Sequence, residues 1–319
     1  MSDLYSAYSR LAANPVPSAF EAEGHALLRA LLPAGAEISA DNLGQLLIRR
    51  RGEGRRLLFV AHADASGIMA SHIDKDGFVR FGLLGRLSPA ALCDREVRFL
   101  SGLRGIIRAE KEAPTLSSEL YIDIGARSRA DAARRVKPGD PALLCDAPRR
   151  LGNRLTANYI DPALPGALLC ALAEEMPGDA DVTLCFSAAA EVEHGAVRAA
   201  AGAVSPELAI LLDCSPAGDV PGADGAALGK GPVLRLMDKG CICSPVALDA
   251  LRNAAEKAGI SLQEELCPDR TSDAGQIQLS AAGIPTAILA LPVRGLGSAL
   301  QSADLRDARA ALQVLRAMI

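Results

Sequence analysis

The stretch LLFVAHADASG, residues 57–67, decides the fold. Five apolar residues come first, and His62 and Asp64 follow them. An apolar run of this length that ends in polar residues predicts a buried strand of a sheet. The chain has only 4 histidines, so a histidine at the end of such a strand needs a partner. His62 is either a metal ligand that Asp64 orients or a buried histidine with a hydrogen-bond partner, and both interpretations stay open at this point.

Strands and helices alternate along the C-terminal half. Apolar runs predict buried strands, and segments with helical periodicity lie between them. The strands are expected at 181–187, 208–215 and 284–292, and the helices at 163–176, 194–204, 244–259 and 302–319. A further helix is expected over 18–33, where Pro33 ends it. The alternation predicts an α/β fold with a parallel or mixed sheet covered by helices, which the strands of residues 41–62 join.

Residues 66–155 have a different hydrophobic pattern. Short runs such as FVRFGLL and SELYIDI alternate apolar and polar residues, and Gly, Asp and Pro separate them. This pattern predicts a small β-rich module. We interpret it as an insertion into one α/β domain that residues 1–65 and 156–319 form together.

Composition excludes several classes of protein. The 319 residues include 34 Lys and Arg against 38 Asp and Glu, for a net charge of −4. This balance indicates neither nucleic acid nor a membrane surface as a partner. The first residues, MSDLYSAYSRLAANPVP, do not have the pattern of a signal peptide, so a cytoplasmic protein is expected. The 8 cysteines have no framework spacing and are interpreted as reduced thiols.

Acidic residues follow several of the expected strands. Glu191 comes after the strand of residues 181–187, Asp213 ends the run LAILL, and Asp161 precedes a helix. Ligands of open α/β sheets bind beyond the carboxyl ends of the strands, where these side chains would meet. For Asp161, capping of the helix is a strong alternative. For Asp213, an unpaired carboxylate directly after this apolar run would be costly, and a bound cation would resolve that cost.

The order of the motifs resembles that of the M42 family of metallo-aminopeptidases, the glutamyl and tetrahedral aminopeptidase group. The resemblance covers nearly the whole chain. It begins at DNLGQLLI and AHADASGIMASHIDKDGFVRF, runs through LYIDIGARSRADAARRVKPGD and ILLDCSPAGDVPG, and ends with SDAGQIQLSAAGIPTAILALPVR. These ordered matches are more specific than any one motif among them.

The resemblance implies a three-layer α/β/α zinc-peptidase-like domain with a β-rich insertion used in dimerisation. It also implies two divalent metal ions, zinc first, with cobalt or manganese as alternatives. By resemblance, His62 and Asp213 would hold one ion, Asp161 would bridge both ions, and Glu191 would hold the second. Asp64 would be the catalytic-site residue that orients His62. The loop around Asp273 would help to shape the substrate pocket.

Departures from the family pattern fall on catalytic positions. Gly297, in RGLGS, stands where the family has a second-metal histidine, and Ala190 stands where it has the general-base glutamate. One metal site is therefore expected rather than two. Glu193 and His194 follow the altered position, and a shifted loop could bring either side chain in as a replacement. Loss of a general base costs on the order of 10²–10⁴-fold in rate.

Two functions follow from these observations. The first is an inactive or attenuated homologue that acts in assembly or binding, through self-association of residues 66–155 or association with a paralogous active subunit. The alternative is an active metal-dependent aminopeptidase that removes N-terminal residues from short peptides with a rearranged second site. A site for a small molecule in the same cleft is a third, weaker interpretation.

Overall fold

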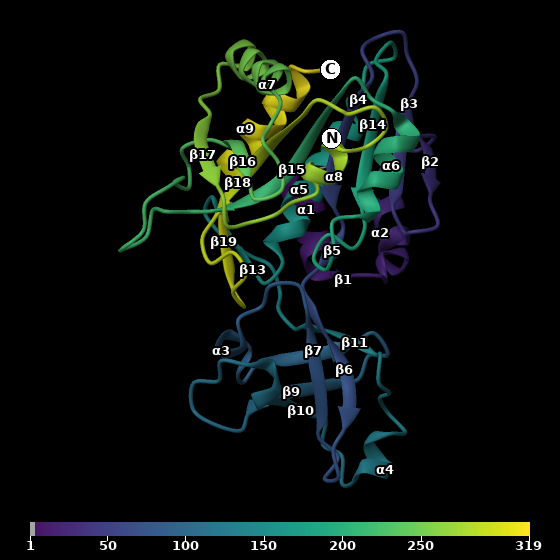
Figure 1. The fold of residues 1–319 in the computed structure, drawn as a ribbon, viewed down its shortest axis with the longest axis vertical. Helices are drawn as coiled ribbons and strands as arrows, with labels where there is room; N and C mark the ends of the chain where they lie inside the picture. The colour runs from purple at the N-terminus through teal and green to yellow at the C-terminus, as the bar shows by residue number, and fades with distance from the viewer. Residues whose placement is uncertain (1–3) are drawn as a thin grey trace.

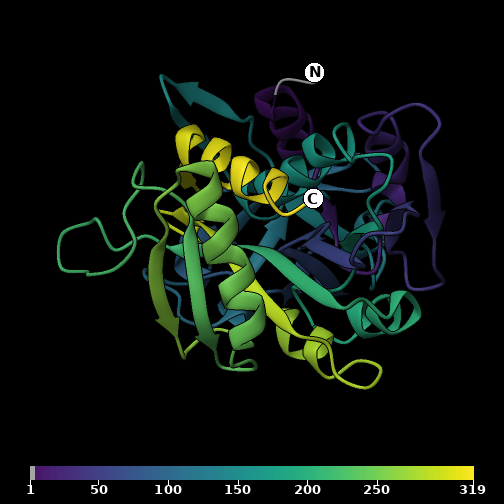
Figure 2. The same ribbon diagram turned by 90° about the horizontal axis from the view of Figure 1, so that it is seen from above.

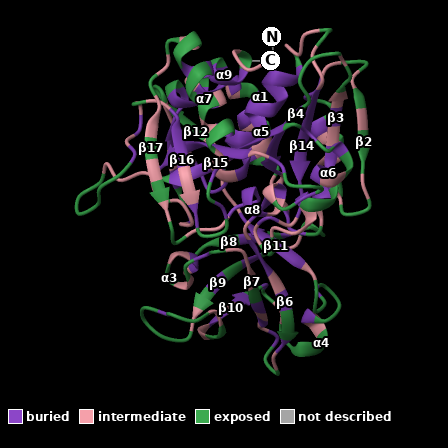
Figure 3. Cartoon of the chain, turned by 45° about the horizontal axis from the view of Figure 1, so that its top comes forward, coloured by how far each residue is buried: buried purple, intermediate pink, exposed green. Residues whose placement is uncertain are grey.

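The computed structural model describes residues 4–319 and has two lobes (Figure 1). The larger lobe contains both ends of the chain, and the smaller lobe is built from a continuous internal segment. Buried residues concentrate in the strands of the large lobe and in the walls of the small one (Figure 3). Each lobe has its own hydrophobic core, as an insertion of this size requires.

An eight-stranded mixed sheet forms the centre of the large lobe, in the order β17-β16-β18-β15-β4-β14-β3-β2. Its four middle strands, β18, β15, β4 and β14, run parallel. Every residue of β4, β14 and β18 is buried, which explains their continuous apolar runs. The strands span Glu37–Ala40 (β2), Leu46–Arg50 (β3), Leu57–His62 (β4), Val182–Ser187 (β14), Leu208–Pro216 (β15), Val233–Asp238 (β16), Gln263–Cys267 (β17) and Thr286–Val293 (β18).

Helices cover the sheet. Helix α5 packs on β4, β15 and β14 and contacts α1 and α9, while α7 lies beside α9 and on β18 (Figure 2). Helices α6 and α8 contact each other and pack on β14 and β18 respectively. These helices span Leu4–Ala13 (α1), Ile160–Ala173 (α5), Ala196–Val204 (α6), Pro245–Ala258 (α7), Ala274–Gln278 (α8) and Leu305–Arg316 (α9). The α/β fold expected from the alternation of strands and helices is confirmed, and the N-terminal strands join the same sheet.

The small lobe is a closed barrel with the strand order β10-β7-β6-β11-β8-β9. Closure leaves no free strand edge, and alternate residues such as Ile107, Leu120 and Ile122 fill the interior. The strands are Gly67–Ile73 (β6), Val79–Leu84 (β7), Glu96–Phe99 (β8), Arg104–Ala109 (β9), Leu120–Asp123 (β10) and Pro141–Leu144 (β11), with short helices at Pro89–Leu92 (α3) and Arg129–Ala132 (α4).

Short strands join the barrel to the rest. β12 (Arg149–Leu151) and β13 (Arg154–Ala157) form a small sheet with β19 (Gln301–Asp304), and β1 (Val16–Pro17) pairs with β5 (Asp64–Ala65). The barrel strands thus end at residue 144. Within the described part of the chain, no helix is long and apolar enough to cross a membrane.

The helix predicted over 18–33 is wrong in extent. That segment has only a 3₁₀ turn at Glu21–Gly24 and the short helix α2, His25–Arg29. Glu21 is buried, and its carboxylate accepts hydrogen bonds from the backbone N–H groups of Ala189 (2.7 Å) and Ala19 (3.1 Å). The Glu21 carboxylate therefore points inward and binds the backbone of the loop after β14, whereas the predicted helix would have exposed it.

Candidate metal centre

The carboxyl ends of the parallel strands bring the candidate residues together. His62 is the last residue of β4, and it lies opposite Ser187, the last residue of β14. Asp213 belongs to the neighbouring strand β15. Parallel strands end at the same edge of a sheet, so side chains from separate parts of the sequence converge there.

His62 is fixed through both ring nitrogens. Its Nε2 lies 2.9 Å from Asp161 Oδ1, and its Nδ1 lies 2.9 Å from the backbone oxygen of Asp64. Burial by itself lowers the pKa of His62, but the charge and hydrogen bond of Asp161 raise that pKa well above its usual value. The backbone of Asp161 is non-helical, and its Oδ1 is the carboxylate atom that lies against the imidazole.

Asp64 is fully buried and contacts more than His62. Its carboxylate accepts hydrogen bonds from Ser18 Oγ (2.6 Å) and from the backbone N–H groups of Ala190 (3.1 Å) and Glu191 (3.0 Å). Its Oδ1 lies 3.5 Å from His62 Nδ1. Asp64 therefore holds both the histidine and the loop that carries Glu191.

The carboxylate of Asp213 already has a cationic partner. The guanidinium of Arg235, which is 0% exposed, donates a hydrogen bond to Asp213 Oδ2 and another, of 2.8 Å, to Glu265 Oε1. Although burial raises the pKa of Asp213, the charge of Arg235 brings the pKa below its usual value. Arg235 therefore already offsets the cost of burying this carboxylate, in the way that a bound cation was expected to do. In the sequence, Arg235 is the one basic residue of the strand VLRLMD, and a charged residue among apolar neighbours indicates a buried partner of opposite charge.

Three side chains still offer ligand atoms to one point. Atoms of His62, Asp161 and Asp213 all lie within 4.8 Å of one another, and no other such group of three occurs in residues 4–319. One imidazole nitrogen and carboxylate oxygens are donors that zinc, cobalt and manganese accept. The donor set therefore fits one divalent cation.

Glu191 lies beside this group. Burial, with the nearby charges of Asp161 and Asp64, raises the pKa of Glu191 to about 7. Its side chain reaches the backbone of Gly85, where a Cβ atom would collide with the carboxylate. The loop after β7 in the barrel thus touches the centre in the α/β lobe.

The two altered positions, Ala190 and Gly297, both line a cavity whose wall includes His62, Asp161 and Asp213. Ala190 is buried and offers no polar side-chain atom. Gly297 has a φ of +81°, and a Cβ atom there would lie 3.2 Å from the backbone oxygen of Arg86. Its backbone conformation favours glycine over the histidine of the family pattern.

The two candidate replacements lie in different places. His194 faces the cavity, where its Nδ1 is 3.0 Å from Asp273 Oδ1 and its Nε2 is 3.1 Å from Thr271 Oγ1. Burial lowers the pKa of His194, but the hydrogen bond and charge of Asp273 raise the pKa above its usual value. Glu193 is exposed and is not part of the cavity wall.

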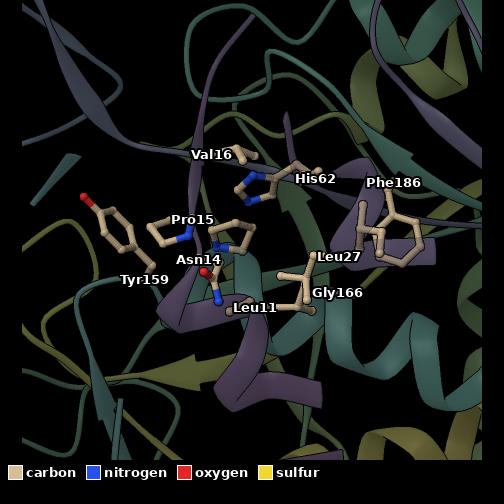
Figure 4. Close-up of a pocket in the computed structure, with 14 residues that line it drawn as sticks. Leu11, Asn14, Pro15, Val16, Leu27, His62, Tyr159, Gly166 and Phe186 are labelled. Atoms are coloured by element: carbon tan, nitrogen blue, oxygen red, sulfur yellow. The ribbon is translucent and has the colours of Figure 1, made fainter. Parts of the chain in front are cut away.

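The cavity has a volume of about 690 Å³ and contains two arginines that the sequence did not single out, Arg86 and Arg270. Arg86 comes from the loop after β7, where no motif marks it, and Arg270 comes from the loop around Asp273 that the family resemblance places at the substrate pocket. A second, mainly apolar pocket of about 440 Å³ lies on another side of His62, which shares its wall with Val16, Leu27 and Phe186 (Figure 4). This packing keeps the imidazole buried.

Comparisons with known proteins agree with this geometry. The profile of the M42 glutamyl aminopeptidase family matches residues 44–314, so the chain belongs to that family. A putative aminopeptidase of Acetivibrio thermocellus is 31% identical over 286 residues, which cover 88% of this chain and 87% of that protein.

Solved structures extend the likeness to the whole fold. An aminopeptidase from the archaeon Desulfurococcus kamchatkensis has a TM-score of 0.93 at 27% identity, with 99% of this chain and 94% of that chain covered. The Pyrococcus horikoshii TET1 peptidase, described as assembling into a tetrahedron or a large octahedral shell, has a TM-score of 0.89 at 26% identity, with 99% of each chain covered. The fold is thus the α/β/α zinc-peptidase type with a β-rich insertion.

Proposed function

We propose that this chain is an M42 aminopeptidase homologue that binds one divalent cation and acts in assembly, with attenuated peptidase chemistry. The observation that carries the proposal is the contrast between two parts of one cavity. His62, Asp161 and Asp213 converge on a point, while Gly297 and Ala190 offer no ligand and no base.

Neither candidate replacement, His194 or Glu193, is free to act as the missing ligand or base. Both ring nitrogens of His194 have partners, Asp273 and Thr271, and Glu193 is exposed and does not line the cavity. Glu191 remains as a potential ligand without the histidine that the family places opposite it. Loss of a paired-metal site removes the clamp on the attacking and departing oxygens.

His62, Asp161 and Asp213 would hold the ion, zinc first and cobalt or manganese as alternatives. When bound, such a cation supplies Lewis-acid chemistry. The chain itself contributes Asp64 and Asp161, which fix the imidazole from two sides, and Arg235, which fixes Asp213. These contacts position the ligands of one ion.

The assembly part of the proposal rests on the barrel. Leu100, Ile106 and Leu116 are large apolar side chains that are exposed on the small lobe, and their burial against a second copy would be favourable. A relative with the same fold forms closed shells. We propose self-association through residues 66–155, with a paralogous active subunit as a further possible partner and short peptides as substrates of any residual activity.

The test is metal content per chain, by elemental analysis after saturation with zinc and removal of loose ions. One ion, lost in H62Q and kept in the control H72Q, supports the proposal. His72 is exposed and lies on the barrel strand β6. Two ions, together with cleavage of short peptides that Asp161→Ala abolishes, would overturn it in favour of an active aminopeptidase.

A further inference from the structure

We propose that Thr271, His194 and Asp273 form a second reactive centre in this cavity, in which the Thr271 hydroxyl attacks the carbonyl carbon of a small carboxylic ester without a metal ion. This inference goes beyond the proposed function. It rests on a connected hydroxyl, imidazole and carboxylate whose donors and acceptors are determined by their neighbours.

The carboxylate of Asp273 decides the protonation of the imidazole. Asp273 Oδ1 can only accept, and it lies 3.0 Å from His194 Nδ1, so Nδ1 carries the hydrogen. In the neutral ring, Nε2 is then an acceptor. Thr271 Oγ1 lies 3.1 Å from Nε2 and donates its hydrogen to it. This is the order of contacts by which a hydroxyl nucleophile and its base are recognised on unrelated folds.

Neighbouring side chains hold this arrangement in place. Asp273 is 3% exposed, and its other oxygen accepts a 2.6 Å hydrogen bond from Ser187 Oγ at the end of β14. Arg86 Nη2 donates to Thr271 Oγ1 over 3.2 Å. Because that oxygen accepts from a guanidinium, its own hydrogen is directed to His194, and the positive charge favours the alkoxide that forms on proton transfer.

A substrate can reach the hydroxyl. Thr271, His194 and Asp273 all line the cavity of about 690 Å³, and Thr271 is only partly buried. Ala190 and Gly297 also line it and leave space that larger side chains would fill. Arg270 lines the same cavity and offers a cationic guanidinium for the negative charge that develops on the carbonyl oxygen.

The chemistry balances within the chain, the ester and water. The Thr271 Oγ–carbonyl carbon bond forms while the hydroxyl proton moves to His194 Nε2. The bond from the carbonyl carbon to the alcohol oxygen then breaks, and the alcohol takes that proton. Water attacks the acyl-threonine, transfers a proton to Nε2, and releases the acid as Thr271 recovers its hydrogen.

The experiment uses the full chain in EDTA with p-nitrophenyl acetate, and it reads both nitrophenol release and the site of acetylation by peptide mass mapping. We expect one acetyl group, on Thr271. Thr271→Ser retains a hydroxyl and should retain acylation. Thr271→Val and His194→Gln should each reduce the rate at least about 100-fold, as removal of a nucleophile or base requires.

Matched controls are Thr115→Val and His72→Gln, which change an exposed threonine and an exposed histidine and should keep the wild-type rate. Acetylation spread over surface groups, or a rate that Thr271→Val and His194→Gln leave unchanged, would overturn the proposal. If Thr271→Val fails to fold, the mapped position of the acetyl group in the wild type and in Thr271→Ser decides. Because EDTA removes metal ions from every sample, a negative result in this assay would not bear on the proposed metal site at His62, Asp161 and Asp213.

Discussion

Replacing Arg235 by methionine tests whether the buried charges around Asp213 are coupled as the structure places them. The guanidinium is 0% exposed and donates to Asp213, to Glu265 (2.8 Å) and to the backbone oxygen of Cys214 (2.9 Å). Methionine keeps much of the volume but none of these donors. Removal of one partner of a buried ion pair costs about 3–5 kcal/mol, because it leaves the other charge uncompensated. We expect R235M to lose stability by that amount in EDTA.

Zinc should offset part of this loss. In the wild type, the Asp213 carboxylate is shared between Arg235 and any bound ion, whereas in R235M the ion is its remaining cationic partner. Each tenfold gain in zinc affinity adds about 1.4 kcal/mol of stability once the site is saturated. Urea unfolding followed by far-UV circular dichroism, with EDTA and with zinc, measures both effects.

The matched control is R252M, because Arg252 is exposed and pairs with Glu264 at the surface. Its loss should stay below about 1 kcal/mol. The reasoning is refuted if R235M loses no more than R252M in EDTA. Equal stabilisation of R235M and the wild type by saturating zinc would refute the coupling between Arg235 and the ion.

Three further changes test the same geometry. In D161N, zinc should no longer raise the melting temperature; a shift equal to that of the wild type would contradict the ligand assignment. The raised pKa of Glu191, about 7 against an ordinary 4.5, means that the metal-free fold keeps a proton that the unfolded chain loses as pH rises from 4.5 to 7. E191Q should therefore exceed the wild type by up to about 3 kcal/mol in stability near pH 8 and by little near pH 4.5, as denaturant unfolding would show. Tyr159 Oη accepts a buried 2.7 Å hydrogen bond from the Leu144 N–H, so Y159F should cost about 1–3 kcal/mol in urea unfolding, and no change would mean that the N–H finds another acceptor.

Most of the fold could be predicted from the sequence because its strands are buried on both faces. The runs around β4, β14 and β18 are apolar at nearly every position, and such runs leave few alternatives to a covered sheet. The segment 18–33 failed because Glu21, which its helical periodicity placed on an ordinary helix, is turned inward to the loop after β14. A tertiary hydrogen bond of this kind leaves no mark on local periodicity.

The candidate site was predictable where residues follow strands and not where they come from loops. Nothing in the sequence measures the distance between His62 and Asp161, although position at the edge of the sheet suggested that they meet. The loop of Thr271 was expected at the pocket, but its contacts with His194 and Arg86 could not be predicted, because they join parts of the chain that are far apart in the sequence. The role of Arg235 was missed because its partners, Asp213 and Glu265, lie on other strands and cannot be identified from the sequence around Arg235.

The charges explain how three ligand residues can stay together without depending on an ion. His62 with its raised pKa compensates Asp161, and Arg235 compensates Asp213. A divalent cation must therefore displace the imidazole proton and share Asp213 with a guanidinium, so its affinity should fall as pH falls. A centre with these internal counter-charges can preserve the fold of the α/β lobe, and with it the position of the barrel loop at Gly85, whether or not the ion is bound. The proposed role in assembly depends on this independence from the ion.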